Sequence, residues 1–377
     1  MPRSADSEAD RDLTAQLATR GLAGSSARYE RWRRADLLPR HNRHGAGRGR
    51  GSISTLAPAT VEIAAALARY AVQGRDLRAA VIEWFFEAGL RAPPGEPVVP
   101  EPPDAAVAEA LVWAVRTAPE YRLLQRARAA VTEAQKDDFY AVAAEQARRG
   151  PDPTAGFDPV SVREALLSSR DIPKDAFASS GSRTDLVHYI AALGFGVDEV
   201  GAEAFADAIA ASGLFPQLSA QQWRDAMIEA DASGTYAEAV TALTRFDLAE
   251  ALENAGIERL RRAREVAAGL AGFGGLLVMH ALLMPDTPGL AALRAGINGL
   301  GMGPALISLA KQVMRPRGIA FAIAGCLQPM YLALYNSLSE LVAAGPPLLY
   351  EAGNDEHDPE RYMATWLSSI RKLSERS

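Results

Sequence analysis

The sequence predicts a mainly α-helical protein. Apolar residues recur at helical spacing through much of the 377-residue chain, and no segment shows the sustained apolar and polar alternation typical of a half-buried strand. Residues 91–104 hold six prolines in fourteen positions, a composition that excludes both a helix and a central strand. We therefore expect an N-terminal domain over residues 13–90, a proline-rich linker over 91–104 and a larger all-helical domain after it.

Composition excludes some classes of protein. The chain is 48% hydrophobic, enough to build real cores, and its single cysteine, Cys326, cannot form an internal disulfide. A disulfide scaffold is therefore excluded, and a reducing compartment is expected. Residues 1–20 are polar and charged without the apolar segment of a secretory signal, so a cytoplasmic location is predicted.

The first 34 residues predict a disordered terminus followed by two short helices. Residues 1–12 are polar and are expected to be disordered, whereas residues 13–22 carry leucines at helical spacing. Ala23 and Gly24 are expected to turn the chain, and Ser25 and Ser26 are suitable N-cap residues for the second helix. Together these segments predict a helix-turn-helix.

The second helix has two different sides. Tyr29, Trp32 and Arg33 share one side, where the aromatic pair is expected to anchor the helix in a small core. Arg28, Arg31 and Arg34 are then expected to point away from that core, and Pro39 is expected to end the helix. This arrangement would let the arginines enter a DNA major groove.

A basic, glycine-rich segment follows at residues 40–56. Glycines alternate with other residues from position 45 to 51, and residues 52–56 look like a strand, so we expect a hairpin that acts as a wing. Two more helices are expected after Pro58 and Asp76, with their aromatic residues closing the core of the small domain. His41 and His44 are expected to contact phosphate or to lie exposed, because no cysteine or acidic residue beside them suggests a metal site.

Positive charge is concentrated in this region. Residues 20–60 hold nine arginines and two acidic residues, a net charge of +7 in a chain of net charge −6. Clustered arginines neutralise DNA phosphates and release counterions, which favours double-stranded DNA as the partner. The predicted DNA-binding residues are Ser25, Ser26, Arg28, Arg31, Arg34, Arg40, Arg43, Arg48 and Arg50.

This stretch resembles a known family. A helix that runs through Trp32-Arg33-Arg34 into Leu37-Leu38-Pro39, then a basic wing, Leu56-Ala57-Pro58 and a helix pair, is similar to the winged helix-turn-helix of MerR-type transcription regulators. The resemblance covers about residues 13–90 and implies a DNA-binding regulator. Glu30-Arg31 stand where that family often has an arginine–tyrosine pair, and prolines stand where its long dimerising helix begins.

Residues 105–264 predict a helical region. Apolar faces are expected within residues 105–149, and shorter helices at 160–168, 183–193, 202–212 and 220–230. Residues 243–264 are expected to form one longer, charged helix. Residues 351–377 are expected to form an acidic loop and a helix.

Residues 265–350 form an apolar region that admits three interpretations. No charged side chain occurs within residues 266–284, 295–310 and 318–338. Such runs are expected in a buried core with a pocket for an apolar small-molecule effector, in a membrane-inserted segment, or in a surface for homodimerisation. The candidate pocket residues are Phe273, Met279, His280, Met284, Tyr331 and Tyr335.

The sequence contains no recognisable catalytic motif, phosphate-binding loop or zinc motif, so no catalytic, cofactor or metal residues are assigned and no enzymatic activity is predicted. These observations together predict a DNA-binding transcriptional regulator whose C-terminal helical part oligomerises or senses a small molecule. The alternative is a membrane-associated protein with a cytoplasmic N-terminal domain that binds DNA or a partner.

Overall fold

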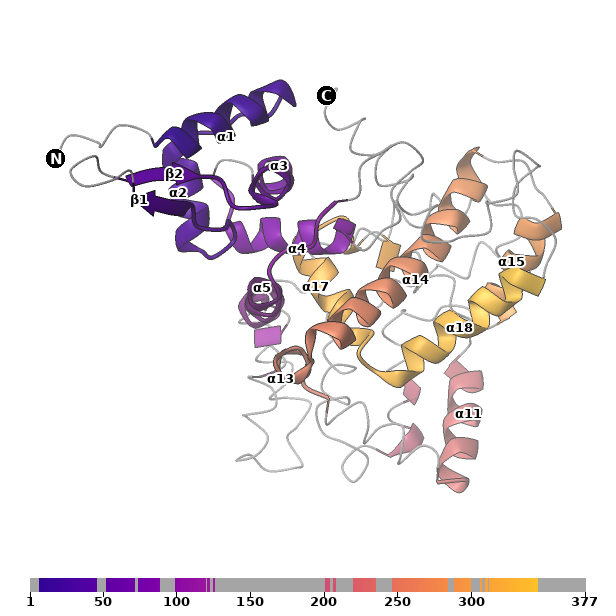
Figure 1. Cartoon of the computed structure of the whole chain (residues 1–377). Helices are drawn as coiled ribbons and strands as arrows, with labels where there is room; N and C mark the ends of the chain where they lie inside the picture. Colours follow the sequence, from indigo (N-terminus) through magenta and orange to yellow (C-terminus); the bar gives the residue numbers. More distant parts are fainter. Residues whose placement is uncertain are drawn as a thin grey trace.

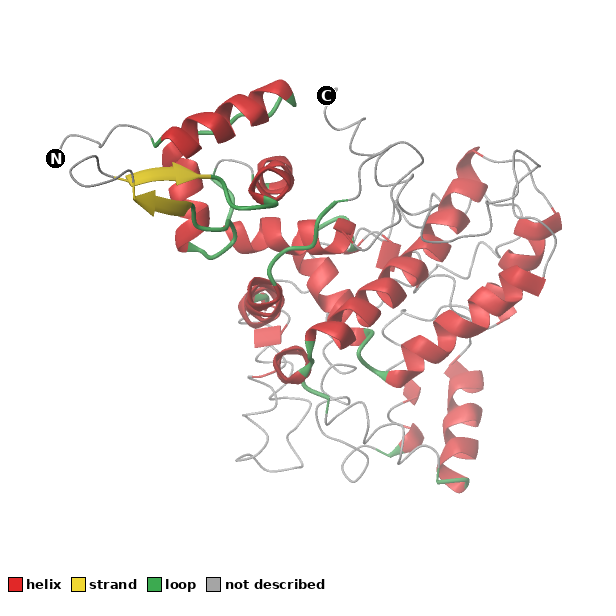
Figure 2. Ribbon diagram, in the orientation of Figure 1, coloured by secondary structure: helices red, strands yellow, loops and turns green. Residues whose placement is uncertain are grey.

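The computed structural model describes residues 7–45, 52–71, 74–88, 99–119, 121–122, 125, 201–203, 206–207, 220–234, 246–283, 288–299, 306, 309–310 and 312–344. Within these residues the chain is mainly α-helical, which confirms the predicted fold class at that level. The sheet formed by the described residues is one two-stranded hairpin, drawn in yellow in Figure 2. The predicted helices at 160–168 and 183–193 and the acidic C-terminal segment lie outside the described residues.

The N-terminal elements gather at one end of the molecule (Figure 1). They are α1 (Glu8–Thr19), α2 (Ser26–Arg34), β1 (Asn42–Gly45), β2 (Ser52–Thr55), α3 (Thr60–Tyr70) and α4 (Leu77–Ala88). The hairpin and the two helices after it therefore form where the sequence predicts them. α3 packs against both α1 and α4, and the leucines and aromatic side chains of these helices are buried together.

The predicted disorder of residues 1–12 is wrong for residues 8–12. α1 begins at Glu8 because Ser7 caps the helix, its hydroxyl accepting a hydrogen bond from the backbone N–H of Asp10 at 3.1 Å. The helix also ends earlier than expected, at Thr19. Gly21 adopts a left-handed conformation (φ 71°), and the backbone N–H groups of Gly21 and Leu22 bond back to carbonyls of the last turn.

The remaining helices form a second helical body. They are α5 (Asp104–Thr117), α11 (Ala220–Ala232), α13 (Leu248–Asn254), α14 (Ile257–Leu283), α15 (Pro288–Gly299), α17 (Pro316–Gly325) and α18 (Pro329–Ala344). α11 confirms the helix predicted at 220–230. Of the helix predicted at 202–212, the four described residues are helical.

Two expected helices are interrupted. Residues 243–264 do not form one helix, because Asp247 caps α13 and the extended backbone at Ala255 separates α13 from α14. Residues 318–338 are divided between α17 and α18, which meet at a bend of 94°. Proline at the first position of α18 has no N–H to continue the hydrogen bonding of α17.

The search for membrane spans was made over the described residues. No single helix there has the length and apolar character to cross a bilayer, and the bent pair α17 and α18 meets the criterion of length and composition only as a pair.

The two parts of the molecule share one hydrophobic core. α4 packs against α5 and α17, and α17 also packs against α5, α13 and α14 (Figure 1). The cluster of buried side chains runs without a break from Leu13 in α1 to Val342 in α18. Residues 89–98 of the predicted linker lie outside the described residues, so the domain boundary there stays a prediction. The helices on either side of it nevertheless touch directly.

A buried arginine strengthens this junction. Arg264 of α14 has a side chain only 5% exposed, and its guanidinium donates hydrogen bonds to the carbonyl oxygen of Phe85 at 3.0 Å and to Glu101 at 2.8 Å. The same group lies 4.5 Å from the centre of the Phe85 ring. One side chain therefore joins α14 to the C-terminal half of α4 and to the segment that leads into α5.

We predict that Arg264→Leu lowers the free energy of unfolding by about 2–3 kcal/mol, because Glu101 and the Phe85 carbonyl lose a charged donor at a largely buried position. Chemical denaturation followed by circular dichroism measures the change. Arg262→Leu is the matched control on the same helix, because Arg262 is half exposed and its ion pair among the described residues is with Glu265 one turn away. Equal losses in the two variants would contradict the assigned role of Arg264.

Candidate nucleic-acid interface

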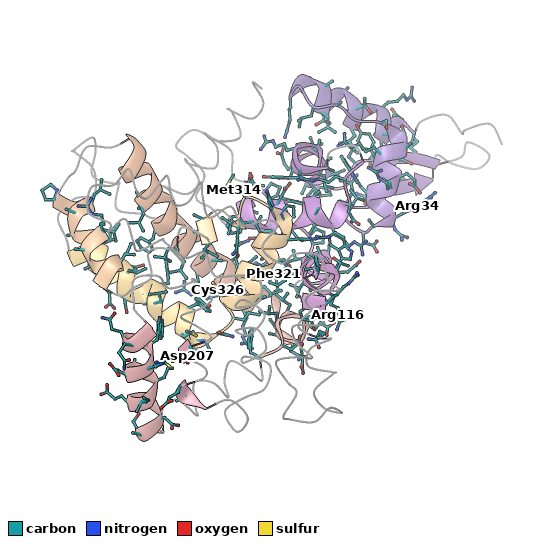
Figure 3. All side chains as sticks on the ribbon, turned by 180° about the vertical axis from the view of Figure 1, so that it is seen from behind. Arg34, Arg116, Asp207, Met314, Phe321 and Cys326 are labelled. Carbon is teal, nitrogen blue, oxygen red and sulfur yellow. The ribbon has the colours of Figure 1, made fainter. Side chains whose placement is uncertain are left out.

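Helix α2 presents one continuous side to solvent. Ala27, Glu30, Arg31 and Arg34 are exposed and follow one another at positions i, i+3, i+4 and i+7. The opposite side is closed, since Tyr29 and Trp32 are fully buried. This confirms the expected anchoring role of the two aromatic residues. Figure 3 shows Arg34 in the N-terminal part of the molecule, far from the labelled residues Phe321 and Cys326.

The turn before α2 fixes its direction. Ser25 is the N-cap, as predicted, and its hydroxyl accepts a hydrogen bond from the backbone N–H of Arg28 at 3.3 Å. Gly24 lies directly against the Tyr29 ring, so that a Cβ atom at this position would fall 1.8 Å from the tyrosine hydroxyl oxygen. That hydroxyl lies 3.2 Å from the hydroxyl of Thr14 in α1. The glycine therefore lets the two helices share this tyrosine.

The end of α2 differs from the prediction. The helix ends at Arg34, five residues before Pro39, because Asp36 adopts a left-handed conformation (φ 51°). The backbone N–H of Leu37 then returns to the Trp32 carbonyl at 2.9 Å. Leu37 and Leu38 are both buried beside the helix.

Arg28 does not point away from the core, and the prediction that it lies on the outer side of α2 is wrong. Its guanidinium donates hydrogen bonds to the carbonyl oxygens of Ala23 and Ala71 and lies 4.9 Å from the centre of the Trp32 ring. Burial, together with the positive charge of Arg31, lowers the pKa of Arg28. Arg28 is therefore a structural link between the start of α2 and the end of α3.

Arg33 and His41 meet at a buried carboxylate. Asp10 of α1 is 8% exposed and accepts hydrogen bonds from Arg33 of α2, from the hydroxyl of Ser7 and, at 3.1 Å, from Nε2 of His41 when that nitrogen is protonated. The expectation that His41 is exposed or contacts phosphate is wrong, because its side chain is 9% exposed. One carboxylate thus connects α1, α2 and the residue that leads into β1.

Charges around Asp10 determine its ionisation. Burial raises the pKa of the Asp10 carboxyl, but the hydrogen bonds from Arg33 and Ser7, the positive charge of Arg33 and the contact with His41 lower it by more. The net pKa is below that of an ordinary aspartate, so Asp10 is ionised at neutral pH. A sequence signal for this site was present in Ser7-Glu8-Ala9-Asp10, a spacing typical of a helix N-terminus with an acidic third residue.

The hairpin follows the helix pair directly. β1 and β2 are antiparallel, with Asn42 opposite Thr55 and His44 opposite Ile53. Arg40 and His44 are exposed, and exposure is one of the two expectations for His44. Of the other predicted wing residues, the backbone of Arg43 is part of β1 but its side chain is not described, and Arg48 and Arg50 lie outside the described residues.

The described arginines of this region divide into two groups. Arg20 pairs with Glu62, Arg33 pairs with Asp10 and Arg28 bonds to carbonyl groups, so these three serve internal contacts. The others are exposed, Arg34 in a pair with Glu30 at 3.2 Å, and Arg31 and Arg40 without a pair among the described residues. Together with the exposed Ser25, these arginines are the part of the predicted interface that lies at the surface, whereas Ser26 is half-buried.

The predicted effector pocket is described only in part. Phe273 of α14 is fully buried, and its ring centre lies 6.5 Å from that of Tyr335 of α18. Tyr331, one turn earlier on α18, is partly buried, and burial raises its pKa. The structure therefore brings Phe273 and Tyr335 together as packing between two helices. The side chains of Met279 and His280 are not described, and Met284 lies outside the described residues.

Comparisons with protein-family models, with curated proteins and with solved structures find no match to this chain.

We predict that Asp10→Asn destabilises the N-terminal part by about 2–4 kcal/mol, because the buried guanidinium of Arg33 loses its close partner and keeps only the longer contact to the exposed Glu30 at 3.7 Å. Chemical denaturation at neutral pH measures the loss. The stabilisation from Asp10 is complete above the pKa of an unfolded aspartate and is lost as the pH falls through the lower folded-state pKa. The difference between wild type and variant should therefore shrink under acid conditions. A difference that is independent of pH would show that the ionised carboxylate is not the stabilising group.

Proposed function

We propose that this protein is a DNA-binding transcriptional regulator that reads double-stranded DNA with α2 as a recognition helix and with the β1–β2 hairpin as a wing. The observation that carries the proposal is the outer side of α2. Its exposed residues Ala27, Glu30, Arg31 and Arg34 form one face, and the opposite side is buried in the core through Tyr29, Trp32 and Arg33. A helix that enters a major groove needs one free face on a rigid support.

The chemistry of this face suits a DNA groove. Ala27 is small enough for close approach, and Arg31 and Arg34 reach outward with the fork of donors that pairs with guanine edges or phosphates. The pair between Arg34 and Glu30 is exposed, so exchanging it for a phosphate or base costs little. Ser25 and Ser26 stand at the N-terminus of the helix, where hydroxyl and backbone groups favour a phosphate.

The C-terminal helical body supplies the second half of the proposal. We assign it to homodimerisation or to sensing an apolar small molecule, since a groove-reading domain commonly acts as a two-fold dimer. Its direct packing against α4 supports a physical connection between the two functions. The same proposal includes a winged helix-turn-helix of the MerR type as the N-terminal DNA-binding unit.

One observation favours the alternative of a membrane-associated protein. α17 and α18 together have the length and apolar composition of a broken membrane segment. Separation of membrane and soluble fractions after expression, without detergent, decides between the two: recovery in the membrane fraction supports the alternative, and full recovery in the soluble fraction removes it.

We predict that Arg31→Ala and Arg34→Ala each weaken binding to a mixed-sequence DNA duplex and reduce the slope of log K against log salt by up to about 1, because each substitution removes one phosphate-neutralising charge. Salt titration by fluorescence anisotropy measures both quantities. The double variant Arg48→Ala/Arg50→Ala tests the wing in the same way. Arg116→Ala is the matched control, since Arg116 is 55% exposed on α5 in a pair with Glu253.

Substitution of Arg28 distinguishes residues that support the fold from residues that would contact DNA. Arg28→Met should lower the melting temperature, because its bonds to Ala23 and Ala71 are lost, whereas the exposed arginines should leave the melting temperature nearly unchanged. If the wild-type chain has no affinity for duplex DNA at low salt, or if no arginine substitution changes it, the proposed function is wrong.

A further inference from the structure

The hairpin has one face toward the core and one face toward solvent. Leu56, directly after β2, packs against the hydrophobic core. Since side chains alternate along a strand, Ser54 lies on the same face as Leu56, and Ile53 and Thr55 lie on the other. The register places His44 opposite Ile53 and Asn42 opposite Thr55. All four residues of this outer face are exposed.

Ile53 is the unusual member of the outer face. Its side chain is 49% exposed, which makes it one of the few large apolar residues at the surface of the described part of the chain. A one-residue shift of register would bury it, but the pairing holds it outward, between polar partners. Folding of the described residues therefore leaves an apolar side chain on the outer face of a strand in an otherwise polar hairpin.

The exposed charges of the same N-terminal part indicate which partner would cover this face. Arg40 is exposed just before β1, and Arg31 and Arg34 are exposed on α2. The contacts of Arg33 and His41 with Asp10 hold α2 and the start of the hairpin together. These exposed arginines give this part of the molecule a positive surface charge that complements a polyanion. An apolar side chain within such a field fits a surface that is both anionic and partly apolar, as a DNA groove is.

We propose that Ile53, with His44 beside it, makes an apolar contact with the sugars and base edges of duplex DNA and so is a specificity-determining residue of the hairpin. This inference rests on the proposed function and adds to it a contact that is not electrostatic. Apolar contacts to thymine methyl groups and to deoxyribose carry base and shape information that phosphate contacts lack. Ile53 thus supplies affinity that salt does not screen, whereas the arginines supply affinity that salt does screen.

The test uses the full chain and a duplex enriched from a random pool by that chain. Ile53→Thr keeps the β-branched shape that strands favour and removes apolar surface, so it should weaken binding about five- to tenfold. The loss should be the same at every salt concentration, with an unchanged slope of log K against log salt. Ile53→Val should retain most of the affinity. Ile228→Thr on α11 is the matched control, because Ile228 is also exposed (45%).

The outcomes are distinct. A parallel, salt-independent loss for Ile53→Thr alone, at unchanged melting temperature, supports the inference. Affinity equal to wild type shows that Ile53 is present only for strand propensity and overturns the inference while the proposed function stands. A loss that comes with a changed salt slope points to a displaced hairpin and also overturns it. If no duplex is enriched and none binds at low salt, the proposed function itself fails.

Discussion

The carboxylate of Asp10 is the interaction on which the N-terminal part depends. α1, α2 and the chain entering β1 are short elements, and short helices depend on tertiary contacts for their stability. By accepting hydrogen bonds from Ser7 and Arg33 and by contacting His41, Asp10 fixes all three relative to one another. The Asp10 carboxylate is buried, so its hydrogen bonds replace those that water would otherwise make with the charge. Such a buried polar network favours one specific arrangement of these elements as well as stabilising it.

One buried charged side chain likewise connects several elements at the junction with the helical body. Arg264 reaches from α14 to the carbonyl of Phe85 and to Glu101, and the aromatic residues of α4 pack beside it. Trp84 adds a hydrogen bond from its indole nitrogen to the carbonyl of Pro100 at 2.6 Å. α4 is therefore held from two directions, by α3 on one side and by α5 and α17 on the other. A displacement of α17 or α14 would therefore shift α4 and, through the shared core, α1 and α2.

Much of the fold could be predicted from local patterns, and the exceptions have physical causes. The hairpin, α3 and α4 followed from turn residues and helical spacing, and Ser25 was recognised as a cap. The break between α17 and α18 differs from the prediction because the uncharged run of residues 318–338 has no polar side to mark where a helix ends. The break at Ala255 lies in a charged segment, where the extended backbone just before Gly256 separates α13 from α14. α1 starts earlier than composition predicts because the cap at Ser7 stabilises a helix in a segment whose polar composition alone favours disorder.

The candidate interface is harder to predict, because a count of charged residues does not show which side chains face solvent and which make contacts inside the protein. Nine arginines between residues 20 and 60 contribute equally to a sum, but in the fold Arg33 neutralises a buried aspartate and Arg28 stabilises carbonyl groups and an aromatic ring. Helical spacing indicated the buried position of Arg33 correctly, whereas the position of Arg28 depends on the end of α3, which is forty-three residues away in the chain. Such a partner is fixed only by tertiary packing, and no local pattern reports it.

This division of the arginines alters how the surface should be understood. The charge available to a polyanion is smaller than the sequence count, since Arg20, Arg28 and Arg33 have partners within the protein and Arg34 shares its charge with Glu30. A surface with fewer free charges gains less from counterion release. Under the proposed function, discrimination between DNA sequences would then rest more on shape and close contact, for which the outer face of α2 and the outward side of the hairpin are available.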